Sequence, residues 1–451
     1  MRDLALLGFI GGLLALGLRR PFLLVLAYVY VDTVSPHRLS YYLLNSIPIS
    51  MIVASLAFAG WLIADPKSGL TVTARQGLMG LLLVYTFYTT SHADFPVDAQ
   101  EKWDWAWKAL AFAMFLPLTL RTRLRIEALV LFLILSAASI VIVGGIKTML
   151  SGGGYGVLNL MVDNNSGLYE SSTISTFAIA LIPLILWAAR FGTVFPPDWR
   201  AKAFAGALVF ACLLMPIGTE ARTGLVCIAV LGVLMLRNAR RRFLYLGAAA
   251  ALAAAALPFL PDSFTGRMAT IQSYQADQSA SVRLAVWDWT WNYALEHPTG
   301  GGFGAYRGNR IMVETVDTRS AGEVEIVSAR MEADEGRAYH SAYFEMLGEQ
   351  GFPGLILFLF IHGAGLVRME VLRRRYRGAE GEEAWISPLA TALQHFQIVY
   401  LVGSLFVGIA YQPFVWLVIG VQIGFDSWCA RRRRRESRPS WAGQGAPAGG
   451  A

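Results

Sequence analysis

Residues Ile126–Gly145 read IEALVLFLILSAASIVIVGG, an apolar run in which Glu127 is the one charged side chain. A transmembrane α-helix needs about 20 predominantly apolar residues to cross the hydrocarbon core of a bilayer. This run is long enough, and the glycines it contains are tolerated in membrane helices. The stretch therefore predicts a membrane-spanning helix.

Similar apolar runs, each extended by its flanking residues, recur on both sides of this stretch, at Ile49–Ile63, Leu78–Tyr88 and Phe204–Met215. Of the 451 residues, 55% are hydrophobic and 15% are charged. A soluble domain normally has about 25% charged residues. The composition therefore excludes a soluble globular protein, and the fold class that we predict is an all-α polytopic membrane protein.

The gaps between the apolar runs alternate in charge. Gaps rich in arginine and lysine lie around residues 65–75, 121–125, 190–202, 237–242 and 368–377, and in the tail after residue 429. The intervening short gaps, which are poor in basic residues, lie around residues 34–43, 91–102, 147–171, 218–221 and 409–412. Because cytoplasmic loops carry an excess of Lys and Arg, the basic gaps are predicted to be cytoplasmic. The same arginines account for the net charge of +7, so this charge is no indication of nucleic-acid binding.

The N-terminus leaves the number of membrane crossings at 12 or 13. Leu4–Leu18 and Phe22–Val31 are each short for a span, so they form either two thin crossings or one broken crossing. We interpret the first as a retained helix, because Arg19-Arg20-Pro21 follows it in place of the small residues of a signal-peptide cleavage site. In either case the C-terminus is predicted to be cytoplasmic.

Four regions follow from this pattern. Residues 1–260 are predicted to hold transmembrane helices 1 to 10, residues 261–351 a large periplasmic loop domain with short helices, residues 352–430 the final transmembrane helices, and residues 431–451 a basic, disordered cytoplasmic tail. The loop is the one long hydrophilic stretch of the sequence. Loops of this length are usually functional or disordered, so we expect it to contribute to the function.

Within the loop, Ser281–Glu296 is predicted to be a helix that Pro298 stops. Its aromatic residues suggest that it lies on the membrane surface; they are Trp287, Trp289, Trp291 and Tyr293. Arg307–Arg337 shows no clear period and is predicted to form an irregular lid. His340–Gln350 is predicted to be a second short helix, which leads through Gly351 and Pro353 into the next span.

Two arginines are candidates for binding a phosphate group. Arg222 lies between two apolar segments joined by almost no loop, where an arginine is costly unless it has a partner or reaches the headgroups. Pairing with Glu220 is the simpler interpretation, and a fixed cation for a phosphate is the functional one. Arg283 has the same two interpretations, a cation–π contact with Trp287 or a second phosphate contact.

His340 is the candidate general base. It stands in Tyr339-His340-Ser341-Ala342-Tyr343, at the predicted start of the helix that re-enters the membrane. The dipole at a helix N-terminus disfavours the imidazolium, so the ring is expected to be neutral near pH 7 and able to accept a proton. Glu345 and Glu349 are the alternative bases, since burial can raise a carboxyl pKa towards neutrality. The segment Gly300–Gly304 lacks the strand–loop–helix context of a phosphate loop and is interpreted as a turn.

These motifs, taken in order, resemble the bacterial O-antigen ligase and O-antigen polymerase superfamily over roughly residues 150–430. The residues that carry the resemblance are Arg222-Thr223-Gly224 at the start of a span, Arg283 followed by Trp287 and Gly302-Phe303-Gly304, and His340-x-x-Tyr343 running to Glu349-x-Gly351. Many members carry Asn where this sequence has Ser341. Ser35-Pro36-His37-Arg38-Leu39 is similar to a subgroup described as O-glycosylation ligases.

The resemblance implies a glycosyltransferase with a GT-C-like fold that uses neither a metal nor another cofactor. Such an enzyme takes a glycan from undecaprenyl diphosphate and transfers it to a lipid A–core hydroxyl, at the periplasmic face of the bacterial inner membrane. This is O-antigen ligation in lipopolysaccharide biosynthesis. His340 would be the catalytic base, and Arg222 and Arg283 would bind the donor diphosphate. Trp287, Tyr343 and Glu349 would support them.

Two alternatives remain open. Within the family, the chain could be an O-antigen polymerase or a protein O-glycosylation ligase, which differ from a ligase in the acceptor. In another class, it could be a flippase or transporter of lipid-linked sugars. Transporters place ionisable groups near the bilayer midplane and often contain repeats. Arg222 and His340 lie at the predicted outer edge, and the sequence shows no internal repeat, so we rank transport second.

Overall fold

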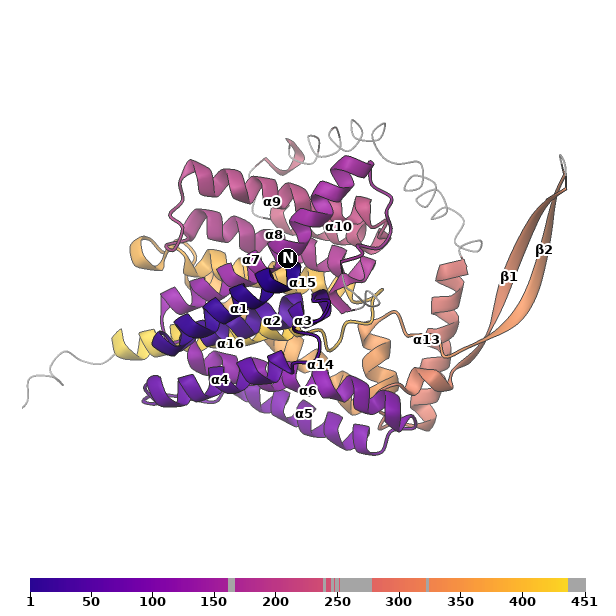
Figure 1. The fold of residues 1–451 in the computed structure, drawn as a ribbon, viewed down its shortest axis with the longest axis horizontal. Coiled ribbons are helices and arrows are strands. Elements are labelled where there is room, and N and C mark those ends of the chain that lie inside the picture. The colour runs from indigo at the N-terminus through magenta and orange to yellow at the C-terminus, as the bar shows by residue number, and fades with distance from the viewer. Residues whose placement is uncertain are drawn as a thin grey trace, which may run out of the picture.

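The computed structural model describes residues 1–160, 167–237, 278–321 and 324–436, together with 241–244, 247 and 251. It is mostly helical, and its helices pack into a bundle (Figure 1). The bundle consists of α1 (Arg2–Arg19), α2 (Phe22–Val34), α3 (Pro36–Leu39), α4 (Ile49–Ala64), α5 (Ala74–Ser91), α6 (Pro96–Thr119), α7 (Arg123–Ser151), α8 (Ser171–Phe191), α9 (Trp199–Gly218), α10 (Arg222–Leu236), α14 (Ala342–Arg375), α15 (Ile386–Gly403) and α16 (Pro413–Glu436). Short 3₁₀ turns lie at η1 (Gly167–Tyr169), η4 (Ala305–Gly308) and η5 (Gly381–Glu383).

The described residues contain five helices that are long and apolar enough to cross a membrane, namely α7, α8, α9, α14 and α16. Three shorter apolar helices, α2, α4 and α10, accompany them. The chain is therefore a multi-pass helical membrane protein, as the sequence predicts. The number of 12 or 13 crossings and the GT-C-like arrangement stay predictions.

The gaps that are poor in basic residues meet at one end of the bundle. Hydrogen bonds join Asp94 to Gly301, Tyr155 to Gly218, Tyr169 to Val34, and Ala410 to Glu345. Each of these bonds connects two segments that the charge pattern assigns to the periplasmic side. We call this the outer end.

The basic gaps meet at the opposite end. Arg121 donates to the backbone carbonyls of Pro66 and Ser68, and Arg431 donates to that of Leu120. The carboxylate of Glu127 accepts a hydrogen bond from the Thr193 hydroxyl at 2.6 Å. The loops therefore sort into two groups as the alternation predicts, and the assignment of these groups to cytoplasm and periplasm rests on the arginine distribution.

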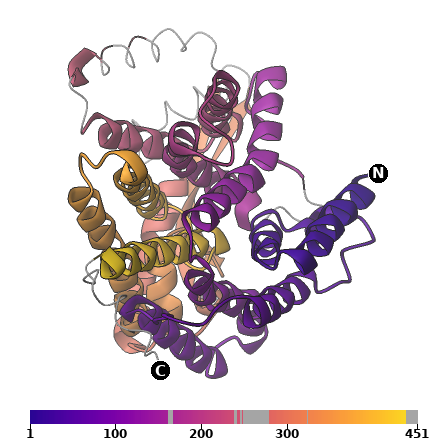
Figure 2. The same ribbon diagram turned by 90° about the vertical axis from the view of Figure 1, so that its left-hand side faces the viewer.

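The centre of the bundle is formed by α8 and α16, whose residues are mostly buried. In contrast, α1 buries only Ile10 and Gly17 and lies at the margin, as the end-on view shows (Figure 2). Leu4–Leu18 and Phe22–Val31 lie in two helices, α1 and α2, which separate at Arg20 and Pro21. Whether they form two crossings or one broken crossing stays open.

The loop region begins with α13 (Gln278–Glu296), which confirms the predicted helix, while residues 261–277 lie outside the described part. The predicted irregular lid is wrong. Residues Arg310–Ala321 and Val324–Glu335 form two antiparallel strands, β1 and β2, with Arg310 opposite Glu335 and Ala321 opposite Val324. Val and Ile occur in both strands, and Thr in β1; these residues fit an extended backbone, which explains the absence of a helical period. The hairpin projects away from the bundle (Figure 1).

The predicted second short helix and the following span are two parts of α14. The helix bends at Gly351, whose φ of 61° lies in the left-handed region. A Cβ there would lie 2.1 Å from the carbonyl oxygen of Pro298, so only glycine fits. At the C-terminus, α16 continues to Glu436, and the basic run 431–435 is therefore helical instead of part of a disordered tail. Residues 437–451 lie outside the described part.

Candidate functional site

His340 precedes Ser341, the N-cap residue of α14, at the outer end of the bundle. It is exposed, and its φ of 48° lies in the left-handed region. This conformation costs a non-glycine residue about 1–3 kcal/mol and persists only where the surroundings impose it. Strained residues of this kind are concentrated at functional sites, and they require surrounding contacts that hold them in place.

Contacts on both sides fix the backbone around His340. The indole Nε1 of Trp287 donates a hydrogen bond of 2.8 Å to the carbonyl oxygen of Tyr339. The same indole stacks on Phe344, with ring centroids 5.0 Å apart and planes 7° from parallel. The amide of Ala342 donates to the carbonyl oxygen of Ser404 at 2.8 Å. Trp287, on α13, therefore packs against α14 and positions the His340 segment.

The charges around His340 favour a neutral imidazole. Desolvation of the ring is the largest cause that lowers the pKa of His340 from its ordinary value of 6.5, and the positive charges of Arg283 and Arg337 lower it further. Glu170 acts in the opposite direction and does not cancel them. The ring is therefore unprotonated near pH 7 and able to accept a proton. Of the predicted site residues, the structure thus brings Arg283 and Trp287 to His340.

Arg222 is the first residue of α10 and lies at the same end of the bundle as His340. A series of contacts connects the two positions. Ser404, which receives the hydrogen bond from Ala342, follows Gly403, and Gly403 packs against Thr176 of α8. The neighbouring Ser175 is hydrogen bonded to Thr219, in the turn that leads to Arg222, with 2.8 Å between the hydroxyl oxygens. The N-terminal part of α8, the start of α10, the end of α15 and the start of α14 are therefore linked by direct contacts.

Glu345 and Glu349 share one cation, Lys102 of α6. The ammonium Nζ lies 2.6 Å from Oε1 of Glu345 and 2.6 Å from Oε2 of Glu349. The Glu349 side chain is only 1% exposed, and it also accepts a hydrogen bond of 3.3 Å from the amide of Gly304. Carboxylates held in this way stabilise α14 against α6 and are poor candidates for a general base. The sequence reasoning missed Lys102, although two acids one helical turn apart on a buried helix face require a cation.

Tyr343 contributes to packing between helices. Its hydroxyl donates a hydrogen bond of 2.8 Å to the carbonyl oxygen of Leu401 on α15, and its ring meets Phe358 edge to face. Tyr343 therefore fixes α14 to α15 two residues after the N-cap.

The glycine-rich segment is a turn that docks on the bend of α14, as the sequence indicates. The amide of Gly301 donates to the carbonyl oxygen of Gly348 at 3.0 Å, and the amide of Gly302 donates to that of Glu349 at 2.9 Å. Because these N–H groups already have acceptors, they do not form an anion-binding nest.

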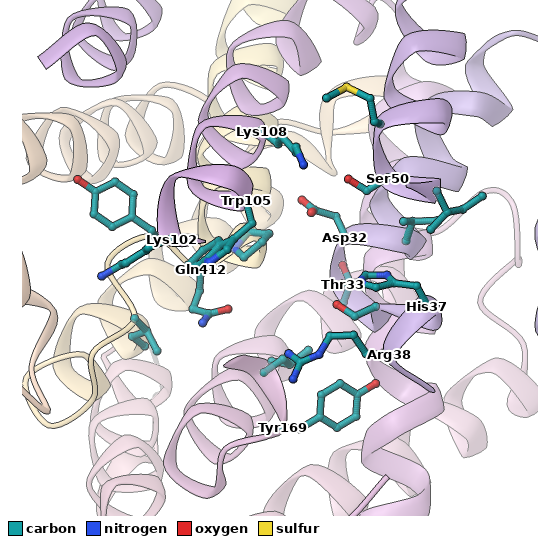
Figure 3. Close-up of a pocket in the computed structure, with 18 of the residues that line it drawn as sticks. Asp32, Thr33, His37, Arg38, Ser50, Lys102, Trp105, Lys108, Tyr169 and Gln412 are labelled. Carbon is teal, nitrogen blue, oxygen red and sulfur yellow. The ribbon is translucent and has the colours of Figure 1, made fainter. Parts of the chain in front are cut away.

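A cavity of about 700 Å³ opens beside this site, between α2, α3 and the start of α4 on one side and α6 on the other. Its polar side chains include Asp32, His37, Arg38, Lys108 and Gln412 (Figure 3). Tyr306 and Glu345 extend its wall to the loop region and α14. The sequence reasoning gave His37 no role. Among the residues that the structure describes, no group of three or more His, Cys, Asp or Glu could hold a metal ion.

Two parts of the chain match different protein families. Residues 207–359 match the O-antigen ligase family, and residues 1–193 match a family of unknown function. The match at residues 207–359 supports the resemblance of this part of the chain to the O-antigen ligase superfamily. No curated protein matches the chain. The O-antigen ligase region contains Arg222, Arg283 and His340 together with Trp287, Tyr343 and Glu349, whereas the cavity is lined mainly by residues outside this region.

Proposed function

We propose that the protein is an O-antigen ligase that transfers a glycan from undecaprenyl diphosphate to a hydroxyl of lipid A–core. The observation that carries the proposal is the setting of His340, within the region that matches the O-antigen ligase family. The residue lies at the outer end in a strained conformation, and its lowered pKa keeps the imidazole neutral. In this proposal the outer end faces the periplasm, and the membrane is the bacterial inner membrane.

His340 acts as the general base in the proposed reaction. The oxygen of the acceptor hydroxyl attacks the anomeric carbon of the donor glycan, and its proton passes to the unprotonated imidazole nitrogen. The bond between the anomeric carbon and the diphosphate oxygen breaks, and undecaprenyl diphosphate leaves with the electron pair. His340 later releases the proton to solvent.

Arg222 and Arg283 stabilise the departing diphosphate in this proposal. A guanidinium keeps its charge and can form two parallel hydrogen bonds to phosphate oxygens. Preorganised cations of this kind lower the energy of the charge that develops on the leaving group, without a metal. The contacts at the starts of α8, α10 and α14 support a shared site for Arg222 and His340.

Trp287, Tyr343 and Glu349 are proposed as positioning residues. Trp287 binds the carbonyl group next to His340, Tyr343 anchors α14 to α15, and Glu349 anchors α14 to α6 through Lys102. None of these contacts uses an atom of His340 itself, so the base stays accessible to an acceptor.

A protein O-glycosylation ligase or an O-antigen polymerase is the second candidate. The observation in favour of the first is that Ser35, His37 and Arg38, part of the motif similar to O-glycosylation ligases, line the cavity beside the site. These enzymes would use the same donor and the same base with another acceptor.

Lipopolysaccharide gel analysis of a deletion strain tests the proposal. Loss of the long O-antigen ladder with retained lipid A–core is the result expected for a ligase. A product with one repeat unit would identify a polymerase, and an unchanged ladder would refute both. Complementation with wild-type protein should restore the ladder, and complementation with His340→Ala at equal expression should not.

A further inference from the structure

The cavity between α2, α3 and α6 has the features of a ligand site in the half of the chain that matches a family of unknown function. Its volume of about 700 Å³ is within the range of roughly 300–1,000 Å³ that is typical of small-molecule sites. We propose that this cavity binds a sugar unit of one of the two substrates, so the inference rests on the proposed glycosyl transfer.

The polar groups of the cavity match the hydroxyls of a sugar. The Oδ2 atom of Asp32 is buried and receives no hydrogen bond from the residues that the structure describes. Figure 3 shows Lys108 facing Asp32 across the cavity. A carboxylate can only accept hydrogen bonds and an ammonium can only donate them. A hydroxyl group does both, so adjacent sugar hydroxyls can satisfy Asp32 and Lys108 together.

The cavity also offers an aromatic surface. Trp105 lines it and is 39% exposed. Figure 3 shows Trp105 beside Gln412, whose amide supplies both donors and an acceptor. The apolar C–H face of a pyranose packs against an indole, while its hydroxyls bind the polar groups at the rim.

The charged side chains of the cavity have both signs. Lys102 lines the cavity, but its ammonium already contacts the carboxylates of Glu345 and Glu349 at 2.6 Å. Arg38 and Lys108 are further cations in the wall, and Asp32 and Glu345 are its carboxylates. A wall with donors and acceptors of both signs suits the hydroxyls of a sugar.

The cavity adjoins the segment that carries the proposed base. Tyr306 lines the cavity, and its ring meets that of Tyr339 edge to face at 5.8 Å. Tyr339 directly precedes His340. A sugar bound near Tyr306 is thus separated from the His340 segment by one aromatic pair.

Saturation-transfer NMR on the purified full-length protein tests this proposal without requiring transfer. One probe is the core oligosaccharide released by mild acid from lipopolysaccharide of the deletion strain. The second is the glycan released by mild acid from the undecaprenyl diphosphate donor, and the third is geranyl diphosphate, which carries no sugar. The first two probes distinguish an acceptor site from a donor site.

Asp32→Asn and Trp105→Ala should each weaken binding of one oligosaccharide at least tenfold, and Trp105→Phe should weaken it less. Asp104→Asn and Trp103→Ala are the matched controls, because neither residue lines the cavity, and should leave binding unchanged. Thermal unfolding of each variant separates lost binding from lost folding.

The proposal is overturned if neither oligosaccharide binds the wild type, or if the cavity variants and the controls bind equally. It is also overturned if the cavity variants lose only geranyl diphosphate. Because the readout is binding, its failure is distinct from that of the proposed function. An unchanged ladder in the deletion strain with cavity-dependent sugar binding would refute ligation alone.

Discussion

Two histidines of this chain, His340 and His362, lie in opposite settings. His362 is buried in the middle of α14, where its Nδ1 lies 3.0 Å from the amide nitrogen of Gln397. Gln397 is in turn bonded to Gln422, and Gln422 to Arg75, so the group forms a continuous buried hydrogen-bonded chain. His340 is exposed, has a left-handed backbone, and is surrounded by arginine charge.

The difference concerns which polar groups are available for chemistry. The groups around His362 bond one another and fix α5, α14, α15 and α16 in place. The contacts around His340 hold its backbone through Tyr339 and Ala342. A transporter would use the buried group, and a ligase would use the exposed one.

The largest effect is expected at His340. Loss of a general base typically costs roughly 10²–10⁴-fold in rate. His340→Ala and His340→Gln should therefore express normally, bind donor and fail to transfer glycan in an assay with purified protein. His362→Gln, the matched control, should keep transfer close to that of the wild type. If His340→Ala transfers at the wild-type rate while His362→Gln does not, His340 is not the base and the buried His362 is the histidine that transfer requires.

Arg222 should show the next largest effect. Loss of one preorganised donor at a developing anion typically costs about 10²–10³-fold in kcat. Arg222→Ala should fall in this range, and Arg222→Lys should still lose most activity because a point charge does not reproduce a bidentate fork. Arg200→Lys, at the start of α9, is the control and should leave kcat unchanged. Photocrosslinking of donor that is unchanged in Arg222→Ala and Arg283→Ala would contradict the assignment.

Lys102→Met should reduce stability more than any surface change. It leaves Glu345 and Glu349 without their shared cation, and removing one partner of a buried ion pair costs roughly 3–5 kcal/mol. The midpoint of thermal unfolding in detergent should fall clearly. Adding Glu345→Gln and Glu349→Gln to Lys102→Met should recover part of the loss. Arg310→Met removes a surface pair whose arginine is 74% exposed, and should leave the midpoint unchanged.

The pH profile of transfer should respond to Arg283. In the wild type, activity falls as pH falls through the lowered pKa of His340, so the acidic limb lies below 6.5. Arg283→Gln removes a positive charge that lowers this pKa, and the normalised acidic limb should move to higher pH. Glu170→Gln removes a charge that raises the pKa and should move the limb to lower pH. Shifts in the same direction, or none, would exclude His340 as the titrating group.

Trp287→Phe should have the smallest effect. The ring still stacks on Phe344, but the hydrogen bond to the Tyr339 carbonyl is lost. One such bond contributes about 0.5–1.5 kcal/mol, so kcat should fall about two- to tenfold while the KM for donor stays constant. A change in the KM for donor with constant kcat would indicate substrate contact instead of positioning.

The parts of the fold that the sequence predicts are those that local chemistry determines. The α13 helix, the short connection before Arg222 and the helix after His340 follow from helical period, apolar length and the positions of Gly351 and Pro353. The hairpin differs from the predicted irregular lid because a strand leaves no helical period in the sequence. Its β-branched residues, on both sides of Gly322, were the available signal.

The remaining site residues depend on contacts between distant segments. Lys102 meets Glu349 across 247 positions of sequence. It lies in a gap that is poor in basic residues, where a count of charges gives no reason to single it out. The cavity joins Asp32 to Gln412, and no local pattern in one sequence connects them. The candidate His340 can be proposed from the sequence because its signal, a histidine before a helix start in the long loop, is local.

The docking of the glycine turn on the bend of α14 has a mechanical consequence. The carbonyls of Gly348 and Glu349 bond to Gly301 and Gly302, in the turn that directly follows α13. The Arg283-bearing helix and the His340-bearing half of α14 are therefore cross-linked by backbone hydrogen bonds that side-chain replacement leaves in place. Replacing a side chain in either helix therefore leaves this backbone link between Arg283 and His340 intact.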